Sequence, residues 1–172
     1  MNQFEYNVKD NLSYLGLSNS IKLLYNTPYP VIICVGSDLA VGDSLGPIVG
    51  SELKDKFKGK AFVYGSLEAP ITAKEIKTVF NTINKLHPKS KILVVDAAVG
   101  DEEDIGKIKI KDVGLKPGEG INKDLEKIGD VSIIGIVSNK ENSKTSIYNN
   151  TRFSLVKKMS NLIVRGILEY LK

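Results

Sequence analysis

Hydrophobic residues fall along this chain in two alternating patterns, continuous apolar runs and stripes at helical spacing. The run at 31–35 follows two prolines and ends at a glycine, as expected of a strand that is covered on both faces. Stripes with intervals of three and four residues predict amphipathic helices. The pattern predicts strands at 31–35, 61–64, 91–95, 107–111 and 132–137, and helices at 10–25, 43–57, 71–86, 121–128 and 147–171.

Strands that alternate with helices indicate βαβ crossovers, and therefore an α/β fold with a mainly parallel sheet between two helical layers. We expect one α/β domain over 1–172, with 1–27 as an N-terminal helical extension. The strands at 31–35 and 91–95 should be central neighbours, with the strand at 61–64 on the far side of the first. Gly46 and Gly50 share one helical face, which predicts close packing of that helix against the sheet.

The amino-acid composition indicates which classes of molecule the protein is expected to bind. Hydrophobic residues make up 42% and charged residues 26% of the chain, as is typical of globular proteins. The net charge of +4 comes from lysines interleaved with acids, whereas nucleic-acid binders more often cluster basic residues and place aromatics between them. We therefore expect no direct nucleic-acid partner.

Cys34 is the only cysteine, so the sequence allows no intrachain disulfide and shows no cysteine-based zinc site. No apolar run approaches the ~20 residues that would span a bilayer, and the N-terminus has no apolar signal core. These features predict a soluble cytoplasmic protein without a membrane partner.

Two aspartates follow central strands of the predicted sheet. Asp43 lies beyond the first strand and its loop, and Asp96 directly follows the strand at 91–95. Ligands of such sheets bind outside the carboxyl ends of the strands, where strand order reverses. Each aspartate also has a structural interpretation, Asp43 as a helix N-cap and Asp96 as the cap of a loop. Their joint position at one edge of the sheet favours a functional pair.

Two neighbouring carboxylates do not both ionise readily, so they tend to share one proton. The ionised member can accept a proton from water while the protonated member polarises a carbonyl, which would hydrolyse an amide without a cofactor. The same oxygens could instead hold a divalent cation. We favour the interpretation in which the two aspartates act without a metal ion.

Further candidates lie in the loops of the same edge. Glu68 follows the second strand, and Gly36, Ser37 and Asp38 follow the first, so we expect these residues to contact substrate. Asp38 could alternatively hold its loop through an Asx turn. The backbone of 116–120 could line the cleft, and the acidic run at 101–104 is interpreted as a solvated turn.

The only histidine, His87, precedes the strand at 91–95 and is therefore expected at the opposite edge. This placement removes Ser-His-Asp and Cys-His catalysis and any multi-histidine metal site. The loop after the first strand also lacks the glycine spacing of dinucleotide-binding and phosphate-binding loops.

The segment Val35 to Pro47, with Gly36-Ser37-Asp38 and Asp43-Ser44-Leu45-Gly46-Pro47, resembles the first-strand motif of spore germination proteases and hydrogenase maturation proteases. Val94-Val95-Asp96-Ala97 matches their second acidic motif. With the stretches at 65–70, 115–120 and 129–137, residues 30–172 resemble the YyaC family of spore proteases.

The resemblance implies a three-layer peptidase-like fold in which Asp43 and Asp96 occupy the catalytic aspartate positions of the germination protease. It also implies small acid-soluble spore proteins as substrates and the forespore or spore core as the location. Hydrogenase maturation proteases bind nickel with a histidine that follows the second acid, and here no histidine follows Asp96.

The leading hypothesis is an aspartate-dependent endopeptidase that acts on protein or peptide substrates and could form a homo-oligomer. A non-catalytic, sporulation-linked binding protein with the same fold is the alternative. Hydrolysis of another amide in the same pocket is a third interpretation.

Overall fold

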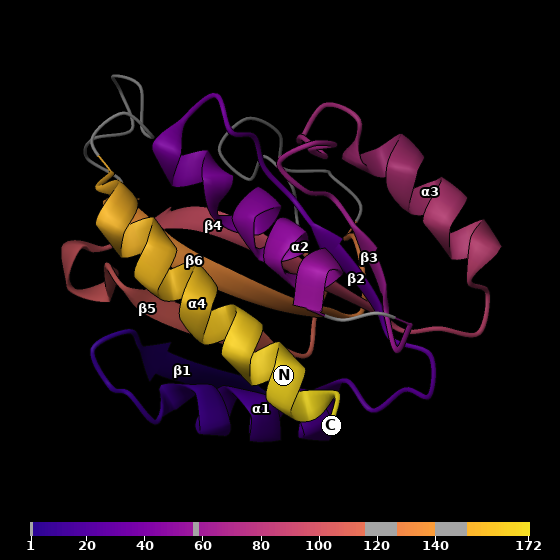
Figure 1. Ribbon diagram of the computed structural model, residues 1–172, viewed down its shortest axis with the longest axis horizontal. Coiled ribbons are helices and arrows are strands. Elements are labelled where there is room, and N and C mark those ends of the chain that lie inside the picture. The colour runs from indigo at the N-terminus through magenta and orange to yellow at the C-terminus, as the bar shows by residue number, and fades with distance from the viewer. Residues whose placement is uncertain (1, 57–58, 116–126, 140–150) are drawn as a thin grey trace.

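The fold is built on one six-stranded sheet. In the computed structural model, which describes residues 2–56, 59–115, 127–139 and 151–172, the strands lie in the order β1-β5-β6-β4-β2-β3. The helices cover this sheet on both faces (Figure 1), so the predicted three-layer α/β architecture is confirmed. The strands are β1 (Gln3–Asn7), β2 (Val31–Cys34), β3 (Phe62–Tyr64), β4 (Ile92–Gly100), β5 (Lys107–Lys111) and β6 (Val131–Asn139).

The centre of the sheet is parallel, as the apolar runs predicted. β2 pairs with β3 on one side and with β4 on the other, and β4 also pairs with β6, all in parallel register. The predicted position of β2 between β3 and β4 is therefore confirmed. β5 pairs antiparallel with β6, and the sheet is mixed at this end.

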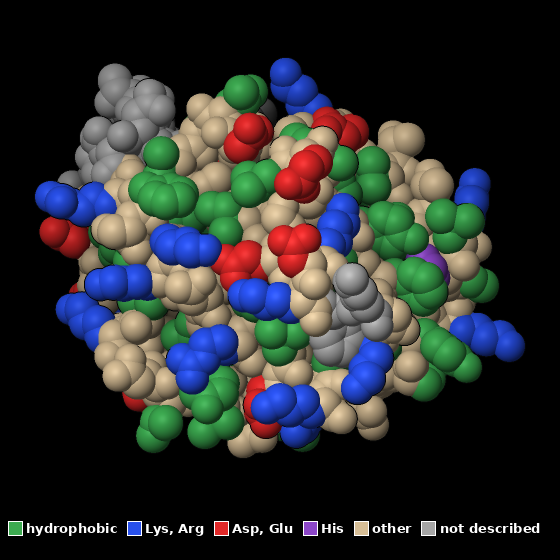
Figure 2. Space-filling model, viewed as in Figure 1, with side chains coloured by type: hydrophobic (Ala, Val, Ile, Leu, Met, Phe, Trp, Pro, Cys, Tyr) green, Lys and Arg blue, Asp and Glu red, His purple; other side chains and the backbone are tan. Residues whose placement is uncertain are grey.

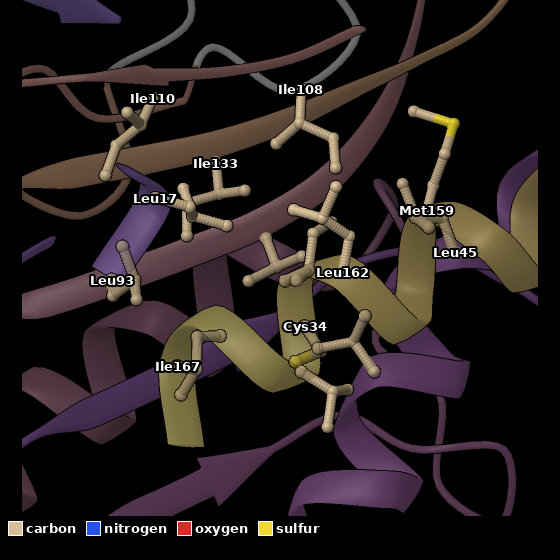
Figure 3. Packing of buried hydrophobic residues seen from close by; sticks show 14 of the residues in the cluster. Leu17, Cys34, Leu45, Leu93, Ile108, Ile110, Ile133, Met159, Leu162 and Ile167 are labelled. Carbon is tan, nitrogen blue, oxygen red and sulfur yellow. The ribbon is translucent and has the colours of Figure 1, made fainter. Parts of the chain in front are cut away.

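Successive side chains along each strand point to opposite faces of the sheet. Ile32 and Cys34 face a large core beneath α1 (Ser13–Leu24), α2 (Leu45–Lys56) and α4 (Phe153–Tyr170), part of which is seen in Figure 3. Val31 and Ile33 face a smaller core beneath α3 (Ile76–Leu86). Both clusters are aliphatic in character, and Cys34 is a fully buried member of the larger one.

The segment predicted as an N-terminal helical extension contains a strand before its helix. β1 pairs antiparallel with β5, and its Phe4 and Tyr6 pack against the large core while the alternate residues of the strand are exposed. The Tyr6 hydroxyl donates to the Gly16 carbonyl oxygen at 2.8 Å, which ties β1 to α1. A run of five residues with two apolar positions is too short for periodicity alone to identify as a strand.

Several element boundaries differ from the prediction. α2 and α3 begin later than expected, at Leu45 and Ile76, and β4 runs to Gly100 rather than ending at Val95. The expected close packing of α2 is observed, because a Cβ on Gly46 would lie 2.0 Å from the Val35 oxygen and one on Gly50 1.9 Å from the Gly65 oxygen. The loop predicted at 116–120, most of the helix predicted at 121–128, and the first four residues of the helix predicted at 147–171 lie outside the described residues.

Candidate functional site

Asp96 lies inside β4 rather than at its tip. It pairs with Ile134 of β6, and that pairing continues to Gly100 opposite Asn139. On the other side of β4, the pairing with β2 stops one residue earlier, at Cys34 opposite Val95. The prediction that Asp96 follows its strand is therefore wrong for β4, but Asp96 is the first residue of β4 beyond the end of β2.

The chain turns away from β4 immediately after β2. Gly36 has a φ of 135°. A Cβ at this position would lie 2.0 Å from the backbone oxygen of Asp43, so glycine is required for the close approach. The Ser37 N–H donates to the same Asp43 oxygen at 3.1 Å, and the Gly36 N–H donates to the Ile71 oxygen at 2.9 Å. These contacts fold the loop back so that residue 43 lies over the end of β2.

Asp43 is the third residue of the 3₁₀ helix η1 (Val41–Ser44), which contacts both β4 and α4. Its side chain is partly buried, and its N–H donates to the Ala40 oxygen at 3.0 Å. The residue directly before α2 is Ser44, whose hydroxyl donates to the Val41 oxygen at 2.7 Å. Asp43 therefore does not hold the position before α2 that its interpretation as an N-cap required.

Burial dominates the electrostatics of both carboxyls. It raises the pKa of Asp96 to about 8, with a further contribution from the charge of Asp43, while the Ala97 N–H opposes the rise by donating to Asp96 Oδ1 at 2.8 Å. Burial also raises the pKa of Asp43, and the Ser37 N–H opposes it. The rise at Asp96 favours a neutral carboxyl there near neutral pH, and the charge of Asp43 contributes to that rise. Environments that separate the pKa values of two carboxyls are typical of an acid and base pair.

Glu68, expected to contact substrate, is exposed in the loop after β3. Its carboxylate accepts a hydrogen bond from the Ser51 hydroxyl of α2 at 3.2 Å. Its pKa is lowered by its own backbone N–H and by the Ser66 and Ser51 hydroxyls. Within the described part of the chain, no interaction joins Glu68 to either aspartate.

In the loop after β2, the side chain that holds the loop is Ser37 rather than Asp38. The Ser37 hydroxyl accepts a hydrogen bond from the Leu39 N–H at 3.2 Å, while the Asp38 side chain is exposed. Gly36 and Ser37 shape the site through their backbone N–H groups, which donate to the Ile71 and Asp43 oxygens. Sequence reasoning missed the Ser37 and Ala97 N–H donors, since every residue except proline has such a group and no side-chain pattern marks them.

His87 lies beside the amino end of β3. Its Nε2 is 2.7 Å from the Tyr64 hydroxyl, and its ring centroid is 4.3 Å from that of Phe62, the first residue of the strand. In the acidic run at 101–104, Asp104 binds Lys107 at 2.5 Å and Lys109 at 2.6 Å, so it is ion-paired rather than simply solvated. Over the ranges that the structure describes, no three His, Cys, Asp or Glu side chains are grouped to hold a metal ion.

Comparison with known proteins gives consistent results. The model of the family described as protein of unknown function DUF1256 matches residues 4–166. The uncharacterized protein YyaC of Bacillus subtilis strain 168 is 39% identical over 151 residues, which are 88% of this chain and 73% of that protein. The predicted resemblance to YyaC is confirmed.

A solved structure with the same architecture is the crystal structure of a NiFe hydrogenase maturation protease, HycI from Thermococcus kodakarensis KOD1. It matches with a TM-score of 0.58 over 91% of this chain and 97% of its own, at 16% sequence identity. This likeness confirms the predicted relation to the hydrogenase maturation protease fold. No helix among the described residues is long and apolar enough to cross a membrane.

Proposed function

We propose, from the premise that this chain belongs to the DUF1256 family, that it is an aspartate-dependent endopeptidase whose acid and base are Asp96 and Asp43. The observation that carries the proposal is the unequal pair of carboxyls at the end of β2. Asp96, with a pKa of about 8, holds a proton at neutral pH, and the adjacent charge of Asp43 helps to keep it there. The maturation-protease-like fold supports a polypeptide substrate.

In the proposed reaction, the Asp43 carboxylate takes a proton from a water molecule as the water oxygen attacks the scissile carbonyl carbon. Asp96 donates its proton to the carbonyl oxygen, so that the tetrahedral intermediate is neutral. The carbon–nitrogen bond then breaks as Asp43 returns its proton to the leaving nitrogen and Asp96 recovers a proton from the hydroxyl. General acid–base catalysis of this kind contributes about 10²–10⁴-fold to a rate.

No metal ion takes part in this scheme. Among the described residues the site offers a cation two carboxylates, and His87 lies at the amino end of β3. Glu68 and Asp38, both exposed beside the loops of the same edge, are proposed to contact the substrate chain. Small acid-soluble spore proteins are the proposed substrates, and the cytoplasm of the forespore or spore core is the proposed location.

Incubation of the purified protein with a small acid-soluble spore protein, followed by mass spectrometry of the products, tests the proposal. Asp43→Asn and Asp96→Asn should each lower cleavage by about 100-fold or more. Asp55→Asn, an exposed carboxyl near the end of α2 with no role in the proposed site, is the matched control and should leave cleavage unchanged. Cleavage should also decline above pH 8 as Asp96 loses its proton.

Cleavage that survives both substitutions would refute the roles given to the aspartates. Binding of the spore protein without cleavage, unchanged by either substitution, would instead favour the non-catalytic binding protein.

A further inference from the structure

A groove of about 450 Å³ lies between α4 and the turn that joins β1 to α1. Its charged side chains are Lys9, Lys158 and Arg165 against the single acid Asp10. Figure 2 shows lysine and arginine side chains gathered over α4 on this face of the molecule. From the chemistry of this groove we propose that it binds an acidic segment of a polypeptide.

The positive charge of the groove is available to a ligand. Among the described residues, neither Lys9 nor Lys158 forms an ion pair, and both side chains are exposed. The neighbouring Lys157 differs, because it is paired with Glu52 of α2. Two unpaired lysines on opposite walls attract carboxylates at little desolvation cost, and the attraction should weaken as salt screens it.

An acidic peptide fits this groove better than a nucleic acid does. Single-stranded nucleic acids are held by basic grooves that also present free aromatic faces on which bases stack. The aromatic side chain here is Tyr14, and the guanidinium of Arg165 covers its ring at 3.8 Å from the centroid. Asp10 on the same wall would repel a continuous row of phosphates, whereas a peptide with spaced acids can avoid it.

α4 connects this groove to the candidate site. The helix contacts η1, which carries Asp43, and its first turn begins at Phe153. Lys158 is five residues further along the same helix, or about 8 Å at 1.5 Å per residue.

The groove therefore acts as an accessory site that selects polypeptides with an acidic cluster near the cleaved bond. This role in cleavage rests on the proposed function, whereas the binding of acidic peptide by the groove does not. Peptide binding by the groove and cleavage are independent of each other, and the experiment measures them separately.

The test measures fluorescence anisotropy of a labelled peptide with four glutamates flanked by glycines, titrated with the full chain at about 50 mM salt. The Asp96→Asn protein should bind this peptide as well as the original does. Lys9→Gln combined with Lys158→Gln should weaken binding about tenfold. Lys85→Gln combined with Lys89→Gln, which removes two exposed charges on and after α3, should change it less than about twofold.

Three outcomes would overturn the proposal. The first is equal binding of the matching glutamine peptide, and the second is an equal loss of affinity in the two double variants. The third is tighter, groove-dependent binding of an oligothymidylate, which would make this a nucleic-acid site. Binding that passes these tests while no protein substrate is cleaved would refute only the proposed peptidase.

Discussion

Replacing Asp96 with asparagine should stabilise the protein in a pH-dependent way. The pKa of Asp96 is raised to about 8 in the folded protein, against an ordinary value of 3.8. The folded state therefore binds a proton that the unfolded chain has already released between these two pH values. Stability falls as pH rises through this window, and the loss is complete above pH 8.

The pKa difference sets the size of the effect. At 1.36 kcal/mol per pKa unit, a rise from 3.8 to about 8 corresponds to about 6 kcal/mol as an upper bound. The side chain is only partly buried, and water reduces the cost of its charge, so we expect about 2–3 kcal/mol. Asparagine keeps the oxygen that accepts from Ala97 and carries no charge at any pH, so the variant avoids this loss.

Urea denaturation followed by far-ultraviolet circular dichroism suits this chain, which has no tryptophan. Asp96→Asn and the original protein should have similar free energies of unfolding near pH 4, and the variant should be more stable by about 2–3 kcal/mol near pH 9. Asp38→Asn, an exposed carboxyl, is the control and should follow the original curve. An Asp96→Asn variant no more stable than the original at pH 9 would refute the assignment of a neutral Asp96 in the folded protein.

Three substitutions and one reactivity measurement test the framework of the fold. Gly36→Ala should lower the free energy of unfolding by about 2 kcal/mol or more in urea titrations, since its Cβ would meet backbone at 2.0 Å, whereas Gly59→Ala, with nothing within 4 Å, should cost less. Tyr25→Phe should cost about 1–3 kcal/mol in the same assay, because the buried hydroxyl bonds the backbone at the start of β2 and just before β4. Asp104→Asn should destabilise the protein at neutral pH, and the difference should disappear as pH falls toward 2, because two lysines lower the pKa of Asp104 to about 2. Cys34, whose pKa burial raises to about 12, should react with a disulfide reagent in urea and not in buffer.

The order of the central strands could be predicted because their signals are local. The run at 31–35 is apolar at every position, which requires cover on both faces. The connections to the strands at 61–64 and 91–95 then constrain the order β3-β2-β4, as found. Asp43 and Asp96 were identified as candidates by the same reasoning, since each follows an apolar run.

Boundaries and charge states depended on partners distant in sequence. β4 continues past Val95 because β6 supplies hydrogen bonds as far as Asn139. β1 is a strand because β5, about 100 residues away, pairs with it. Neither partner is visible in the local pattern of the residues concerned, so the predicted end of β4 was wrong and β1 was missed.

The unequal pKa values of the two aspartates and the basic groove are products of the tertiary structure alone. Burial of Asp96 arises from packing around the end of β2, and composition says nothing about how much water reaches a side chain. The groove joins residues near 10 to residues near 160, in a sequence whose lysines look evenly spread. The sequence by itself determined which segments could form strands and helices. It also determined which acidic residues would lie at one edge of the sheet. Only folding decided which of them meet, because contact and desolvation depend on neighbours that the chain brings together from far apart.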